Sequence, residues 1–112
     1  MATLSIRVDL NPSKRLGPGK IDLLEKIAEL GSISAAGRAM SMSYRRAWEL
    51  VADLNAAFGQ PVVEAQPGGK SGGGARLTAF GRELVTRYRA IEADAAKAVA
   101  PHLKAFESAS RK

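Results

Sequence analysis

The sequence has no cysteine, a single histidine and no long apolar run. Without cysteine the chain can form no disulfide, thiol nucleophile or cysteine-ligated zinc site. One histidine also argues against a histidine-based metal site, so no metal and no cofactor is expected. No apolar stretch approaches the roughly 18 residues that a membrane span needs. The N-terminus carries Arg7 and Asp9 and no apolar segment, which does not fit a signal peptide, so we expect a soluble, cytoplasmic protein without a membrane partner.

Acidic residues are also in the minority. The 112 residues contain 17 Lys plus Arg against 11 Asp plus Glu, which gives a net charge of +6. Hydrophobic residues make up 46% and charged residues 25%, as in ordinary globular proteins, and the length fits one compact domain. A domain this basic is attracted to polyanions, with nucleic acid as the leading candidate and an anionic membrane surface as the second.

The N-terminal part of the chain predicts a strand and then a helix. Residues 4–10 alternate apolar and polar side chains, the pattern of a half-buried strand. From Lys20 the apolar residues follow a helical period, and Gly31 ends this helix as a C-cap glycine does. The apolar face comprises Ile21, Leu24, Ile27 and Ala28, widened by Leu23 and Leu30.

Two further helices follow at short spacing. Ser32 can cap a short helix of small residues, residues 41–43 break it, and Ser43 can cap a helix over residues 44–58. The buried stripe of this helix comprises Ala47, Leu50, Val51, Leu54 and Phe58. Two helices joined by a tight turn of about three residues predict a helix-turn-helix over residues 32–58.

A β-hairpin and a long helix complete the chain. Short strands at 61–65 and 75–77 flank a glycine-rich loop and predict a wing over residues 61–77. Thr78 caps a helix whose apolar residues continue beyond what the domain's own core requires, which predicts a dimerisation seam with a coiled-coil period. This seam comprises Phe80, Leu84, Tyr88, Ile91, Ala95 and Ala98. Pro101 must interrupt or kink the helix, with a short final turn at residues 103–106.

The order of elements therefore predicts a mainly α fold with a small β-hairpin wing. It is a winged helix-turn-helix followed by a long C-terminal dimerisation helix. We assign residues 1–77 to the DNA-binding domain and residues 78–112 to the dimerisation helix and tail.

Three motifs carry a family resemblance. Residues 31–37, GSISAAG, and residues 43–49, SYRRAWE, resemble the helix-turn-helix of LysR-type regulators and, more closely, that of ModE-type molybdate-responsive regulators. The wing, residues 68–75, and the LTAFG segment at residues 77–81 are similar as well. The resemblance covers residues 4–99 and implies DNA binding. Members of that family carry C-terminal oxyanion-binding domains, and we expect this chain to be the DNA-reading unit without them.

The candidate DNA contacts lie at the start of each helix of the motif and in the wing. Two arginines in the first turn of a recognition helix interact unfavourably with the helix dipole, and no local interaction compensates for this cost. Their presence therefore favours contact with DNA over a solvated face. The glycine-rich wing with its cations suits a phosphate backbone or a minor groove, the alternative being a disordered loop. The candidates are Ser32, Ser34, Ser43, Tyr44, Arg45, Arg46, Lys70, Ser71 and Arg76.

Several of these side chains have a structural alternative. Ser43 can cap its helix, contact a phosphate or do both, and the same choice applies to Ser32 and Ser34. Trp48 lies one position off the buried stripe, and we expect partial burial rather than a base contact. Arg82 lies near the base of the wing and could reach a phosphate.

No nucleophile, paired base or carboxylate cluster is present, so the chain is not expected to be an enzyme. The leading hypothesis is a homodimeric, sequence-specific transcription regulator bound to double-stranded DNA. The alternatives are a nonspecific nucleoid-type DNA binder and a winged-helix module that binds another protein. A separate sensor protein and an oxyanion such as molybdate remain open as further partners.

Overall fold

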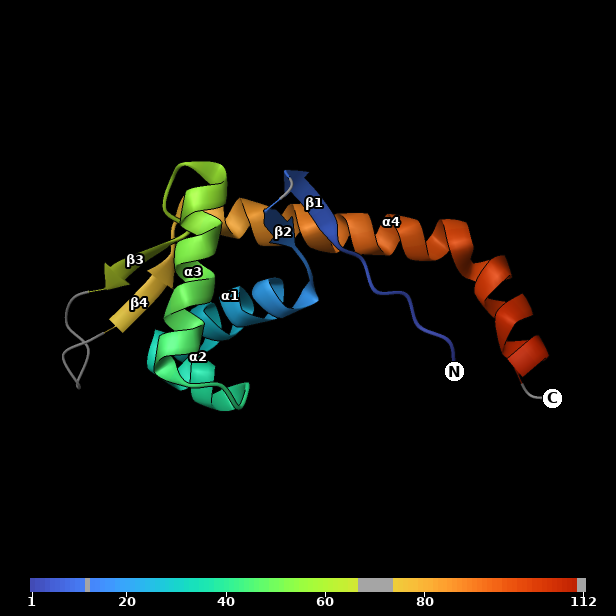
Figure 1. The fold of residues 1–112 in the computed structure, drawn as a ribbon, viewed down its shortest axis with the longest axis horizontal. Coiled ribbons are helices and arrows are strands. Elements are labelled where there is room, and N and C mark those ends of the chain that lie inside the picture. Colours follow the sequence, from blue (N-terminus) through green and yellow to red (C-terminus); the bar gives the residue numbers. More distant parts are fainter. Residues whose placement is uncertain (12, 67–73, 111–112) are drawn as a thin grey trace.

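The structure is a computed structural model that describes residues 1–11, 13–66 and 74–110. A compact body of helices and strands lies at one end, and one long helix projects from it (Figure 1). The projection stretches the molecule to 54 × 27 × 22 Å. In chain order the elements are β1 (Val8–Asn11), β2 (Lys14–Leu16), α1 (Pro18–Leu30), α2 (Ile33–Ala39), α3 (Tyr44–Phe58), β3 (Val63–Gln66), β4 (Gly74–Leu77) and α4 (Ala79–Ser110).

The helix boundaries follow from local capping. The Ser32 hydroxyl accepts a hydrogen bond from the Ala35 amide at 2.9 Å, and the Ser43 hydroxyl accepts one from the Arg46 amide at 3.0 Å. Each bond satisfies a first-turn donor that the helix leaves unpaired. Gly31 ends α1 in the left-handed conformation, with φ +73°, as predicted.

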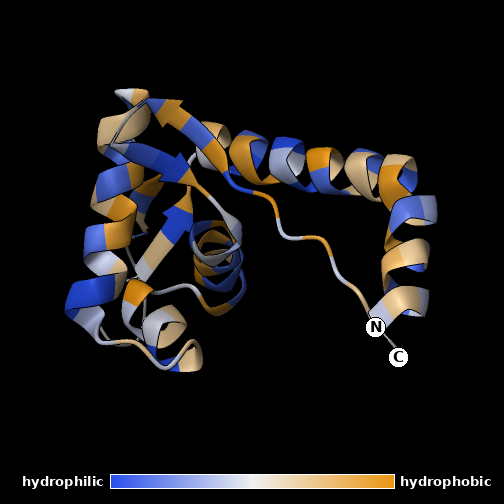
Figure 2. Cartoon of the chain, turned by 45° about the vertical axis from the view of Figure 1, so that its right-hand side comes forward, coloured by the Kyte–Doolittle hydropathy of each residue, from blue (hydrophilic) through white to orange (hydrophobic). Residues whose placement is uncertain are grey.

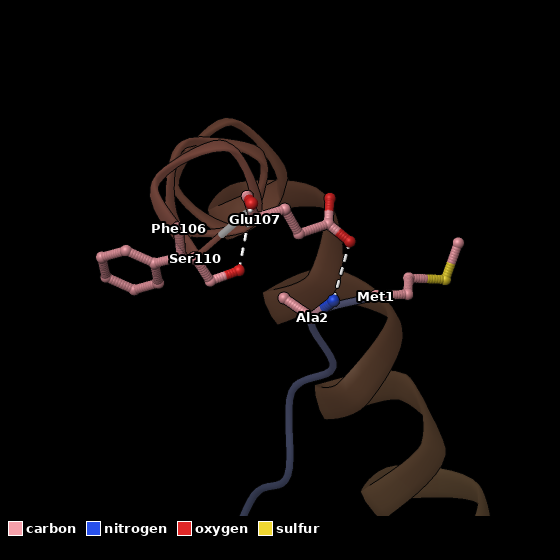
Figure 3. Close-up of a pocket in the computed structure, with 5 residues that line it drawn as sticks. All are labelled: Met1, Ala2, Phe106, Glu107 and Ser110. Carbon is pink, nitrogen blue, oxygen red and sulfur yellow. Dashed lines mark hydrogen bonds between the residues drawn. The ribbon is translucent and has the colours of Figure 1, made fainter. Parts of the chain in front are cut away.

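The predicted N-terminal strand is wrong in its bounds. The strand begins at Val8 rather than at residue 4, and it pairs antiparallel with β2, which the sequence did not indicate. The residues before β1 run along α4 instead, where the Tyr88 hydroxyl donates to the Ile6 carbonyl at 2.6 Å. At the far end of α4 the Ala2 amide donates to the Glu107 carboxylate at 2.7 Å (Figure 3). Of the apolar residues in the alternating pattern, Ile6 and Val8 are half-buried, whereas Leu4 and Leu10 are exposed.

One hydrophobic core joins α1, α2, α3, the wing strands and the first turns of α4. Its largest fully enclosed side chains are Ile21, Leu23, Leu24, Ile27, Leu54, Val62 and Tyr88. The Ala75 amide bonds the Gly31 carbonyl at 2.8 Å, and this bond fixes the wing to the end of α1. The wing is therefore held against the end of α1 through β4.

The first half of the predicted dimerisation seam is buried within the chain itself. Leu84 and Tyr88 are 8% and 1% exposed, and the Phe80 ring packs edge-on against Phe58 at 5.2 Å between ring centroids. Sequence periodicity cannot distinguish a stripe that packs on its own domain from one that meets a partner. Only Ile91, Ala95 and Ala98 extend beyond the core, where apolar and polar residues alternate around the projecting helix (Figure 2).

α4 changes direction within its last third, as the prediction of a kink at Pro101 requires (Figure 1). Proline has no amide to donate, and its ring crowds the preceding turn. The short final turn expected at residues 103–106 is instead part of a helix that continues to Ser110.

Arg89 holds α4 against α1 through carboxylates on both helices. Its guanidinium bonds Asp22 at 2.8 Å and Glu92 at 2.7 Å, and it also bonds Glu25. The Arg89 hydrogen bond holds the pKa of Glu25 below its usual value. The same bonds raise the pKa of Arg89. Nothing in the local sequence identifies this role, since the partners on α1 lie more than sixty positions away.

Replacing Arg89 with methionine is expected to lower the free energy of unfolding by roughly 1 kcal/mol at pH 7, since three carboxylates lose a shared, partly exposed partner. The contribution of Glu25 is present above its ordinary pKa of 4.5 and is lost as the pH falls through the lowered pKa of the folded state. The stability gap between wild type and Arg89→Met should therefore close below about pH 4. Urea unfolding across pH measures it. Arg87→Met, which breaks only an exposed pair within α4, is the control, and an equal loss there would contradict the clamp.

Candidate nucleic-acid interface

The first turn of α3 carries two exposed arginines. The opposite side of α3 is buried through Ala47, Leu50, Val51 and Leu54, so the exposed side is fixed by core packing. The Arg45 side chain is 89% exposed and that of Arg46 is 58% exposed. Two guanidinium groups therefore project from a rigid helix whose far face is anchored.

Glu49 is the only acidic side chain that pairs with these two arginines within the described residues. Its carboxylate lies 3.4 Å from Arg45 Nε and 3.8 Å from a terminal nitrogen of Arg46. Exposed pairs of this kind are worth at most about 1 kcal/mol, so either arginine can exchange the contact for another acceptor.

Trp48 is exposed, contrary to the partial burial that the sequence predicts. Its side chain is among the large hydrophobic groups left in solvent, at 53%, and Tyr44 is exposed to 57%. The two rings are four residues apart and share one flank of α3. The signal that could have identified this flank is the helical position of Trp48, which falls outside the buried stripe.

The two serines that begin α2 have different surroundings. The Ser32 hydroxyl caps α2, whereas the Ser34 hydroxyl accepts a hydrogen bond from the exposed Arg38 guanidinium at 2.9 Å. Both serines are half-buried. A capping bond uses one acceptor site of a hydroxyl and leaves its proton free to donate.

The wing carries one cation whose charge is locally compensated. Arg76 pairs with Glu64 on the neighbouring strand at 2.8 Å, and this cross-strand pair was not expected. Arg82 does not project as a free cation, because it donates to the Leu77 carbonyl at 2.9 Å. Lys70 and Ser71, the predicted contacts at the tip, lie outside the described residues.

Sequence reasoning also missed a set of cations beside α3. Arg15 and Lys20 come from β2 and α1, and they line a surface hollow together with Arg46. Nothing in the local sequence places these residues near the recognition helix, because the hollow forms only when the β1–β2 hairpin folds back.

We also searched the described residues for metal sites and for helices that could span a membrane. Across the described part of the chain, no group of three or more His, Asp or Glu side chains is placed to hold a metal ion. Likewise, none of the helices that the structure describes has the length and apolar character needed to cross a membrane.

Comparison with known protein families identifies the family of this helix-turn-helix. The family described as "Bacterial regulatory helix-turn-helix protein, lysR family" matches residues 19–82, which span α1 to the start of α4. The chain belongs to this LysR family. The match includes both helices of the motif and the whole wing, and it begins after the β1–β2 hairpin.

Similar proteins confirm the resemblance to ModE-type regulators. The chain is 49% identical over 83 residues to the molybdenum-pterin-binding protein MopB of Rhodobacter capsulatus, covering 74% of this chain and 31% of MopB. It is 37% identical over 92 residues to the molybdenum transport protein ModE of Azotobacter vinelandii, covering 82% of this chain and 33% of that protein. The chain thus spans about a third of the length of these relatives.

A solved structure supports the fold assignment. The crystal structure titled as the CbnR_DBD–DNA complex superposes with a TM-score of 0.57 at 20% identity, covering 84% of this chain and 97% of that chain. The predicted winged helix-turn-helix with a long C-terminal helix is therefore confirmed as the LysR-type fold.

Proposed function

We propose that the chain is a sequence-specific, DNA-binding transcription regulator that acts as a homodimer. The observation that carries the proposal is the exposed first turn of α3. There the Arg45 side chain is 89% exposed, within a LysR-type helix-turn-helix. Recognition helices of this motif place such residues against base edges in the major groove.

In this proposal, α3 reads the bases through its outer face. Arg45 donates bidentately to a guanine, and the exposed rings of Tyr44 and Trp48 contact thymine methyl groups. Ser43 keeps its capping bond and donates its hydroxyl proton to a phosphate. The exposed tryptophan supports this arrangement, because burial in the chain's own core does not account for it.

Phosphate contacts flank the helix and hold it in register. Ser32 and Ser34 at the start of α2 meet one strand's backbone, and Lys70 and Ser71 of the wing meet another phosphate. Arg76 contributes less than an isolated cation would, since Glu64 lies 2.8 Å from it. Arg46 is shared between α3 and the flanking backbone.

The projecting part of α4 forms the dimer contact, through Ile91, Ala95 and Ala98. We propose residues 1–77 as the DNA-reading part and residues 78–112 as the part that meets a second copy. The first turns of α4 also belong to the core, so a dimer contact farther along it fixes the orientation of α3. Two α3 helices about 34 Å apart would read successive major grooves, which predicts an imperfect palindrome.

Arg45→Ala is expected to reduce discrimination between the preferred site and a random duplex by about 1–3 kcal/mol, because it removes a bidentate base contact. Lys70→Ala is expected to weaken binding to both duplexes alike and to make the salt dependence shallower by about one unit per phosphate lost. Fluorescence anisotropy with both duplexes separates the two effects.

Arg87→Ala, which removes an exposed cation from the part of α4 that packs on the core, is the control for loss of one charge. If Arg45→Ala and Lys70→Ala changed both duplexes by the same factor, the chain would be a nonspecific DNA binder. If the wild-type protein bound neither duplex, a protein-interaction module would replace the proposal.

A further inference from the structure

A basic hollow of about 430 Å³ lies beside α3, between the β1–β2 hairpin, the beginning of α1 and the α2–α3 turn. Cationic side chains come to it from the segment before β1, from β2, from α1 and from α3, and no acidic residue lines it. The charged lining residues are Arg7, Arg15, Lys20 and Arg46. This concentration of one charge on one concave surface favours an anion.

The charges of two of these residues are not compensated nearby. Arg7 pairs with Asp9 at 2.9 Å, and Arg46 has the longer contact with Glu49. Among the described residues, Arg15 and Lys20 form no ion pair, and the Lys20 ammonium donates instead to the Arg15 carbonyl at 2.8 Å. The hollow therefore holds two cations whose charge a bound anion would neutralise.

The position of the hollow identifies the source of that anion. Arg46 and Leu50 of α3 form one wall, on the flank of α3 next to its exposed outer face. When a helix lies in a major groove, the sugar-phosphate backbones run along both of its flanks. An anion seated here would stand directly beside the base-reading face.

We propose that this hollow binds a phosphate group of the DNA backbone that borders the groove occupied by α3. The proposal rests on the proposed function and deepens it, because it adds the β1–β2 hairpin to the DNA interface. Arg15 and Lys20 neutralise the phosphate, and Arg46 links this contact to the recognition helix. The hairpin lies outside the residues matched by the LysR family, so this contact is an addition to the family's helix-turn-helix core.

The test compares two double variants of the full chain. Arg15→Ala with Lys20→Ala removes two cations of the hollow, and Lys26→Ala with Arg87→Ala removes two cations from α1 and from the part of α4 that packs on the core. Affinity for the preferred duplex and for a scrambled duplex is measured against salt concentration. With one phosphate lost per protomer, the first variant should make the slope of a dimer shallower by about 1.8 on both duplexes. The second should retain the wild-type slope, and thermal melting should confirm that both fold.

A wild-type slope for Arg15→Ala with Lys20→Ala, together with lost discrimination by Arg45→Ala, would overturn this site and leave the proposed function intact. Absence of duplex binding by the wild-type chain would overturn both. Calorimetry without DNA, using inorganic phosphate and molybdate, covers the other source of the same chemistry. The hollow would be assigned to a free oxyanion instead if the wild-type chain gave heat of binding and Arg15→Ala with Lys20→Ala gave none, while the salt slope of that variant on duplex DNA stayed at the wild-type value.

Discussion

DNA affinity is expected to fall by roughly 10³–10⁵-fold between about 50 and 200 mM salt, if the dimer makes on the order of six to ten phosphate contacts. Each contact releases condensed counterions from the duplex, and added salt opposes that release. The chain carries the charge for this, with a net +6 per copy. Several of its cations also gather beside α3, since Arg15 and Lys20 share a hollow with Arg46, and Arg45 is the neighbouring residue on α3.

Anisotropy titrations at five or more salt concentrations give the slope of log affinity against log salt. The specific and random duplexes should show comparable slopes, because phosphate contacts do not depend on sequence. A slope near zero on both duplexes would contradict the electrostatic interface and favour an apolar protein-binding surface.

Gly81→Ala is expected to destabilise the fold by roughly 3 kcal/mol, the upper part of the range for an overpacked core. A β-carbon at this position would overlap the Val62 carbonyl oxygen, where no further atom fits. That carbonyl accepts the Thr78 amide at 3.0 Å, so moving it breaks the junction between the wing and α4. A loss of this size is a large part of the roughly 5–15 kcal/mol that stabilises typical domains.

Gly19→Ala is the control, because Gly19 is also a helical glycine but has no heavy atom within 4 Å of the place that a β-carbon would take. Alanine favours the helical conformation more than glycine does, so this variant should match or slightly exceed wild-type stability. Thermal unfolding should show a melting temperature roughly 10–20 °C lower for Gly81→Ala. Equal melting temperatures for the two variants would mean that α4 does not pack on Val62 this closely.

The local features of the helix-turn-helix could be predicted from the sequence. The apolar stripe of α3 and the capping residue Ser43 both mark where α3 begins. Gly59, in the left-handed conformation, marks where α3 ends. Each signal lies within a few residues of the boundary it determines. For that reason the bounds predicted for residues 44–58 agree with those of the structure.

Features that depend on distant partners could not be predicted in this way. The stripe from Leu84 to Tyr88 fits either a dimer seam or a core, and contact with Ile6 and α1 decides for the core. The three residues of β2 carry no alternation of their own and become a strand only by pairing with β1.

In the candidate site, too, some features could be predicted from the local sequence and others depend on the rest of the fold. Arg45 could be identified from its place in the first turn of α3, whereas the exposure of Trp48 depends on what the rest of the fold leaves uncovered. The pairing of Arg76 with Glu64 follows from the register of the hairpin.

Selection of duplexes from a random pool, by the purified chain at about 150 mM salt, tests the central claim most directly. A homodimeric, sequence-reading regulator should enrich an imperfect palindrome whose half-sites are about one helical turn apart. Substituting Arg45 with alanine should then relax the preference at one position in each half-site. Binding without any enriched sequence, or enrichment of a single half-site alone, would contradict sequence reading by a dimer.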